Sequence, residues 1–173
     1  MWNPEKSIKL SLICTKFVII FILLGTAACP FFVWQLAEAA PWIPGWVVVY
    51  FNNIPWAIFL VAFYLTCVPV LIAFFRLHGL LSAVSAGEIF IPENVRRLRV
   101  ISWSCISVSL IFLATFIAFW AVDASSPVRT HFSLMILLLG MAVIIAFIGV
   151  LIRVMKNVFE TAVTLKDEND FTI

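Results

Sequence analysis

Residues 100–122 read VISWSCISVSLIFLATFIAFWAV, and this run contains no Lys, Arg, Asp, Glu or His. A helix that crosses a membrane needs roughly 20 apolar residues, because the hydrocarbon core of a bilayer is about 30 Å thick. A long run that is uncharged and apolar on every side is not typical of a helix in a small soluble protein. The stretch therefore predicts a membrane-spanning helix.

Three further runs have the same character, at residues 17–34, 56–75 and 132–152. Of the 173 residues, 64% are hydrophobic and 12% are charged, whereas about 25% of a soluble domain is charged. A soluble fold of this length could not cover so much apolar surface, and in lipid a helix satisfies its backbone hydrogen bonds within one segment. We therefore expect an all-α, polytopic membrane protein, with residues 1–173 forming one four-transmembrane-helix bundle.

The basic residues are distributed unevenly between the predicted spans. Ten of the eleven Lys and Arg lie in the N-terminal tail, in the loop 76–99 or in the tail 153–173, and only Arg129 lies on the opposite side. Loops rich in Lys and Arg stay in the cytoplasm. The pattern predicts that both termini and the loop 76–99 are cytoplasmic, which requires an even number of spans.

Helical periodicity continues beyond the second and fourth spans, which predicts cytoplasmic helical extensions. We expect Gly87 to end the first extension and Pro92 to begin the helix that leads into span three, although Ile91 offers no side-chain acceptor as its N-cap. We also expect the extensions to pack together through ion pairs. The predicted pairs join Arg96, Arg97 or Arg99 to Asp167, Glu168 or Asp170.

Small residues predict how the spans pack, because close approach of small side chains associates helices in lipid. Span four has one such face, formed by Ala142, Ala146 and Gly149. Span three has two, one with Ser102, Cys105 and Ser109, the other with Ser104, Ser107, Ala114 and Ala118. Two faces predict a central position between two neighbours. The same polar residues could instead line a path for a solute, and Pro30 and Pro69 are expected to kink spans one and two.

The segment Thr26-Ala27-Ala28-Cys29 is similar to a lipoprotein processing site, where cleavage precedes a lipid-carrying Cys. The apolar run continues after Cys29 as far as Trp34, which exceeds the core of about 7–15 residues in a removed signal. We therefore expect an uncleaved spanning helix. The four cysteines lie in or beside apolar runs without Cys-x-x-Cys spacing, so we expect no structural disulfide.

Motifs of several function classes are absent from the sequence. It contains no Gly-rich phosphate loop, no Gly-x-Ser-x-Gly elbow and no His or Cys pair with zinc-ligand spacing. No acidic residue lies at membrane depth, which disfavours an ion-coupled transporter but leaves a passive pore open. We expect a non-enzymatic protein without a cofactor or a metal. Arginines beside a span are explained by topology and by anionic lipid, so we expect no direct binding of nucleic acid.

Two segments outside the spans resemble motifs of one bacterial family. They are GEIFIPENVRRLR at residues 87–99 and LKDENDFTI at residues 165–173. They resemble the G-x-x-F-x-x-x-N-x-x-R-L segment and the acidic D-[LF]-T-[VI] ending of the DUF2975 family, also called YoaS-like membrane proteins, which share the four-span layout. Ile91 departs from the pattern, since Ser or Thr is usual there. The matching residues are Gly87, Phe90, Asn94, Arg97, Leu98, Asp170, Phe171, Thr172 and Ile173.

The resemblance implies a protein of the bacterial inner membrane whose activity is not established. Genes of the family often neighbour small helix-turn-helix regulators, which implies a partner of this kind in signalling or stress response. We expect the chain to contact the lipid bilayer and to bind a cytoplasmic protein or a second copy of itself. The alternative is a small channel, carrier or immunity-type protein with a site between the spans. The candidate interaction motif comprises Gly87, Phe90, Asn94, Arg97, Arg99, Asp170, Phe171 and Ile173.

Overall fold

The computed structural model describes residues 4–38, 54–124 and 132–170 of the chain. Within these ranges the chain forms four helices, and each of them contains one of the four predicted apolar runs. They are α1 (Pro4–Glu38), α3 (Ile54–Ser85), α4 (Pro92–Ala124) and α5 (Phe132–Asp170). All four are long and apolar enough to cross a membrane. The prediction of an all-α, multi-pass membrane protein is therefore confirmed.

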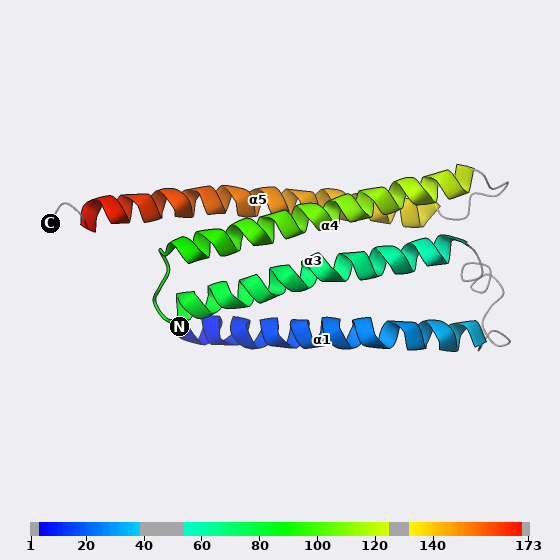
Figure 1. The fold of residues 1–173 in the computed structure, drawn as a ribbon, viewed down its shortest axis with the longest axis horizontal. Helices are drawn as coiled ribbons and strands as arrows, with labels where there is room; N and C mark the ends of the chain where they lie inside the picture. Colours follow the sequence, from blue (N-terminus) through cyan, green and yellow to red (C-terminus); the bar gives the residue numbers. More distant parts are fainter. Residues whose placement is uncertain (1–3, 39–53, 125–131, 171–173) are drawn as a thin grey trace.

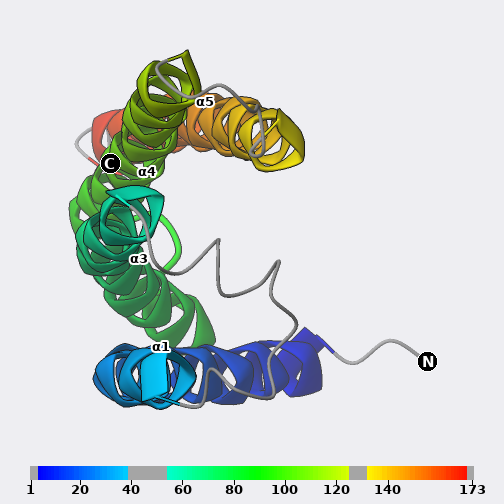
Figure 2. The same cartoon turned by 90° about the vertical axis from the view of Figure 1, so that its right-hand side faces the viewer.

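The helices pack side by side in the order of the sequence, and neighbours run antiparallel (Figure 1). The principal contacts join α1 to α3, α3 to α4, and α4 to α5. Seen along the helices, the four form an open arc with α1 and α5 at its two ends (Figure 2). Large apolar side chains point outward, among them Phe21, which is 79% exposed. Such a surface is suited to lipid rather than to water.

Helices α4 and α5 pack through the small residues that the sequence singled out. The Ser102 hydroxyl donates a hydrogen bond of 2.8 Å to the Gly149 carbonyl oxygen, and the Ser109 hydroxyl donates one of 2.8 Å to that of Ala142. A Cβ atom added to Gly149 would lie 3.1 Å from the Cβ of Cys105. The backbones approach closely because Gly149 has no side chain. This interface, together with the contacts of α4 with α3, gives α4 the predicted central position.

Two smaller groups of contacts connect the other helices. Near the end of α4, Phe119 is buried with Met135 and Leu138, and residues of α3 such as Ile58 pack against them. Between α1 and α3, the Tyr64 hydroxyl donates a hydrogen bond of 3.2 Å to the Thr26 carbonyl oxygen. Helix α3 runs through Pro69 as one helix.

All four helices exceed the thickness of a bilayer core. Helix α5 has 39 residues, and at about 1.5 Å per residue it is nearly twice as long as a hydrocarbon core of about 30 Å. The excess of α3 and α5 lies beyond residues 75 and 152, which confirms that both helices continue past the predicted spans. We call the end of the molecule where α1 begins, α3 ends, α4 begins and α5 ends the terminal face (Figure 1).

Candidate interaction surface

The turn between α3 and α4 begins at Gly87, the predicted end of the first extension. Gly87 has a φ of 82°, in the left-handed region that favours glycine. Its amide donates to the Val84 carbonyl oxygen at 3.1 Å, and the next amide, of Glu88, donates to that of Ala83 at 3.0 Å. These two hydrogen bonds form a Schellman cap that satisfies carbonyl groups at the end of α3. Gly87 therefore has a conformational role in the motif.

Asn94 lies in the first turn of α4, which begins at Pro92 as predicted, and its side chain points back into the preceding turn. It is fully buried, with a relative exposure of 0%. Its Nδ2 donates hydrogen bonds to the carbonyl oxygens of Glu88 at 2.8 Å and Ile89 at 2.9 Å. These backbone groups have left the helical ladder and need partners. Asn94 supplies them and so fixes the path of the turn.

Arg97 connects the same turn to the body of α3. Its Nη1 donates to the Gly79 carbonyl oxygen at 2.8 Å and to Oδ1 of Asn94 at 3.0 Å. Its Nε lies 3.7 Å from Oε1 of Glu93. A Cβ atom added to Gly79 would lie 3.4 Å from the Arg97 Nε, so the guanidinium packs directly on the glycine backbone. Asn94 and Arg97 thus form an internal clamp between α3 and α4.

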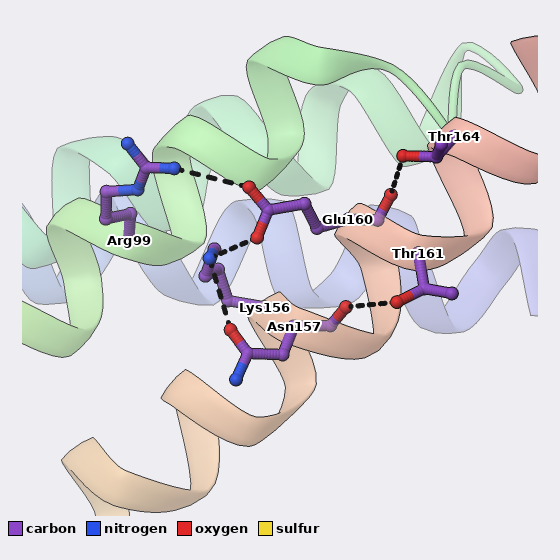
Figure 3. Close-up of polar contacts among 6 residues, drawn as sticks. All are labelled: Arg99, Lys156, Asn157, Glu160, Thr161 and Thr164. Carbon is purple, nitrogen blue, oxygen red and sulfur yellow. Dashed lines mark hydrogen bonds and ion pairs between the residues drawn. The ribbon is translucent and has the colours of Figure 1, made fainter.

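Phe90 and Arg99 extend from this corner toward α5. Phe90 is 46% exposed, and its ring centroid lies 5.7 Å from that of Phe159. The Nη2 of Arg99 lies 3.5 Å from Oε1 of Glu160, whose other carboxylate oxygen pairs with the Lys156 ammonium. Figure 3 shows the Glu160 carboxylate between these two cations, with Arg99 on α4 and Lys156 on α5. The α4 corner and the α5 extension are therefore in contact, whereas the predicted packing of the α3 extension on the α5 extension is not among the principal helix contacts of the described residues.

The hydrogen bond from Lys156 is the main cause that holds the pKa of the Glu160 carboxyl below its usual value. Desolvation opposes this effect, and the charges of Lys156 and Arg99 add to the lowering. Glu160 was not among the three acids predicted to pair with the arginine cluster. Of those three, Glu168 lies in α5, while the side chains of Asp167 and Asp170 lie outside the described residues. Phe171 and Ile173 of the candidate motif also lie outside them.

The sequence reasoning overlooked two residues of this corner, Gly79 and Glu160. A glycine within an apolar helical pattern can indicate close approach of another group, and that signal was present at Gly79. Glu160 follows Lys156 by four residues, which is the spacing of an ion pair on one helix face. Neither signal identifies the partner on another helix, because the relative register of α3, α4 and α5 is set by their packing.

A groove lies between the start of α4 and the α5 extension. Its volume is about 360 Å³, and it combines basic, acidic and apolar side chains. Its lining residues are Pro92, Val95, Arg96, Arg99, Glu160, Val163 and Thr164. No carboxylate among the described residues is within ion-pairing distance of Arg96. The groove can therefore accept an acidic and apolar segment.

Between the spans the surface is apolar instead. A hollow of about 400 Å³ separates parts of α3 and α4, and its one hydroxyl, on Thr115, donates to the Ile111 carbonyl oxygen. Ser102, Ser109 and Ser107 of α4 also donate to backbone carbonyl oxygens. These four hydroxyl groups are used in helix packing or within α4.

The chain is similar to one family of membrane proteins. The family described as "Protein of unknown function (DUF2975)" matches residues 33–173. The chain is 27% identical over 127 residues to "Uncharacterized membrane protein YoaS" of Bacillus subtilis (strain 168), a match that covers 71% of this chain and 76% of that protein. No solved structure matches the chain.

Proposed function

The chain belongs to the DUF2975 family, and from that premise we propose that it is a non-enzymatic membrane protein whose terminal face docks a cytoplasmic partner. The proposed partner is a protein such as a helix-turn-helix regulator acting in signalling or stress response. This proposal includes the predicted orientation, with the terminal face in the cytoplasm. The spans then serve as an anchor, and recognition takes place outside the lipid.

The groove between α4 and the α5 extension is the observation that carries the proposal. It lies beyond the predicted ends of spans three and four, and it is lined by Arg96 and Arg99 together with Val95 and Val163. Basic charges beside apolar side chains fit a partner segment that is acidic and apolar, such as one face of an amphipathic helix. The exposed ring of Phe90 adds apolar surface at the same corner.

The internal clamp supports the groove without forming part of its surface. Asn94 is fully buried, and the Arg97 guanidinium donates hydrogen bonds to the Gly79 carbonyl oxygen and to Oδ1 of Asn94. Both therefore position the start of α4, whereas Phe90, Arg96 and Arg99 are exposed to a partner. The ending Asp170, Phe171 and Ile173 belongs to the proposed surface through its sequence alone.

Charge reversal in the groove tests the proposal. The full chain carrying Arg96→Glu is purified from native membranes beside wild type and beside Arg76→Glu. Arg76 is the matched control, because it is an exposed arginine at the predicted end of a span but lies outside the groove. We expect wild type and R76E to bind the purified regulator, and R96E to bind it at least about ten-fold more weakly, since like charges across an interface are strongly unfavourable.

A chain that ends at Leu165 tests the C-terminal segment in the same assay. We expect its binding to be weaker than that of wild type. Equal binding by wild type and R96E would exclude the groove as the docking site, and equal binding by the shortened chain would exclude the C-terminal ending from it.

A further inference from the structure

Three basic side chains of α4 and α5 lie close together at the boundary between the predicted spans and the terminal face. Arg99 immediately precedes span three, Arg153 immediately follows span four, and Lys156 lies one turn further along α5. With Ser102 and Trp103 they line a small pocket of about 70 Å³. A water molecule in the liquid takes up about 30 Å³, so the pocket can admit the free oxygens of one small oxyanion.

The close crossing of α4 and α5 brings the three cations together. Ser102 donates its hydroxyl to the Gly149 carbonyl oxygen, so the backbones meet directly beneath the pocket. Arg99 lies one turn before Ser102, and Arg153 lies one turn after Gly149. Side chains one turn from a crossing point, on the same side of it, meet above the contact. The pocket is thus built by the packing of two spans.

Positive charge exceeds negative charge at this position. Glu160 is one carboxylate shared by Arg99 and Lys156. Among the described residues no carboxylate lies within ion-pairing distance of Arg153, whose guanidinium lies 5.2 Å from the ring centroid of Trp103. The Lys156 side chain is only 14% exposed, and it donates to Oδ1 of Asn157 at 3.1 Å besides Glu160. The third ammonium N–H of Lys156 and the guanidinium N–H groups of Arg153 remain available for an anion.

We propose that this pocket, formed by Arg99, Arg153, Lys156 and Trp103, binds the phosphate group of an anionic phospholipid. Lipid phosphates form a layer of anions at the depth where spans three and four are predicted to end. Trp103 is 54% exposed there, and indole rings favour the headgroup layer. Guanidinium groups pair well with phosphate oxygens, and basic pockets between spans bind acidic lipid headgroups. The proposal does not depend on the docking groove, because Arg153, Lys156 and Trp103 lie outside the lining of that groove.

Binding of lipid to the purified full chain in detergent tests the proposal. The probes are phosphatidylglycerol, zwitterionic phosphatidylcholine and inorganic phosphate, and the readouts are bound lipid in native mass spectrometry and the shift in Tm. We expect phosphatidylglycerol to bind and to raise Tm, phosphatidylcholine to bind more weakly, and inorganic phosphate at equal concentration to have no effect.

Arg153→Gln is the informative variant, because Arg153 is exposed and its replacement leaves the Glu160 pairs intact. R153Q loses the charge-assisted hydrogen bonds that a guanidinium in the pocket makes to the phosphate oxygens, so it should bind phosphatidylglycerol about ten-fold more weakly. Arg153→Lys should retain more binding than R153Q. Arg76→Gln removes an equal charge outside the pocket and should bind like wild type.

Three results would overturn the proposal. They are unchanged phosphatidylglycerol binding by R153Q, an equal loss of binding by R76Q, or an effect of inorganic phosphate that equals that of the lipid. The last result would indicate a site for a free anion. Since R153Q leaves Arg96 and the groove unaltered, loss of lipid binding here and loss of regulator binding in R96E are independent outcomes.

Discussion

Asn94 shows how one residue of the family motif stabilises the fold. Its amide has two donor hydrogens and an acceptor oxygen, and the structure uses both kinds of group. Nδ2 bonds to the carbonyl oxygens of Glu88 and Ile89, and Oδ1 accepts from Arg97. Asp lacks the donors and Ala lacks all three groups, so neither could make the hydrogen bonds that Asn94 makes.

Replacement of Asn94 by Ala should destabilise the protein by about 1–3 kcal/mol, because it leaves buried polar groups without partners. The measurement is the Tm of the purified chain in detergent. Asn157→Ala is the control, because Asn157 is exposed. Within the described part of the chain, its side chain makes one hydrogen bond, which it accepts from the neighbouring Lys156. An N94A chain as stable as N157A would contradict the clamp.

Gly87 offers a test of backbone conformation alone. Nothing lies within 4 Å of a Cβ added at Gly87 or at Gly25, but only Gly87 has a positive φ. A left-handed conformation costs an L-residue about 1–2 kcal/mol, whereas Gly→Ala within a helix is neutral or stabilising. Gly87→Ala should therefore lower Tm and Gly25→Ala should not. Equal effects of the two would show that the turn does not require glycine.

The sequence could identify these residues but could not show their orientation. The likeness to the family motif singled out Asn94 and Arg97, and the pattern alone allowed a surface role as well as an internal one. Their partners are carbonyl oxygens of Glu88, Ile89 and Gly79. Backbone acceptors carry no sequence signature, so only the folded corner reveals that both side chains point inward.

At the scale of helices, the α4–α5 interface was the part most accessible from sequence. Ser102 and Ser109 on one helix, with Ala142 and Gly149 on the other, were predicted to form packing faces, and they meet as pairs. The end of α3 and the start of α4 were also accessible, since Gly87 and Pro92 mark them, but the start of α1 at Pro4 was not predicted. Glu160 was missed because its contact with Arg99 depends on the axial position of α5 relative to α4. The residue pattern of either helix alone does not determine that position.

Gly149→Ala should destabilise this interface. The added methyl group would lie 3.1 Å from the Cβ of Cys105 and 3.4 Å from the backbone oxygen of Ser102, so the helices would have to separate. Overpacking of this kind costs roughly 1–3 kcal/mol. The readout is Tm in detergent, with Gly140→Ala as the control, because a Cβ at Gly140 meets nothing within 4 Å. Tolerance of both substitutions would contradict close backbone contact.

The ion pairs of Glu160 predict a pH dependence. Its pKa in the folded chain lies below its ordinary value of 4.5. Ionised Glu160 therefore stabilises the fold at pH values above that ordinary pKa, and this contribution is lost as pH falls through the pKa of the folded chain. We expect the Tm advantage of wild type over Glu160→Gln to be present near neutral pH and to disappear in acid. A difference that stays constant from about pH 7 to about pH 3 would contradict this.

At the scale of the whole molecule, the charge distribution predicts a fixed orientation. Ten of the eleven basic residues lie in the N-terminal tail, the loop 76–99 or the tail 153–173, while Arg129 lies in the sequence between α4 and α5. A reporter phosphatase that is active only outside the cytoplasm should be inactive when fused after Ile173 and active when inserted beside Arg129. The opposite activities would reverse the topology and remove the cytoplasmic docking proposal.

The open arc of helices was not predictable from the sequence. Apolar residues on every side of α1 indicate lipid or protein neighbours equally, so composition could not show that its principal neighbour is α3 alone. Small residues on two faces of α4 did indicate two neighbours. They could not show whether α1 and α5 would meet and close the ring, because that depends on the angles at three interfaces.

The same arrangement has a consequence for biosynthesis. Each helix makes its principal contacts with the helix that precedes or follows it in the chain. Contacts between sequence neighbours need little loop closure and form fast. Each helix that leaves the ribosome can therefore dock on the one inserted before it, and the order of synthesis is also an order of assembly in which no earlier contact has to open.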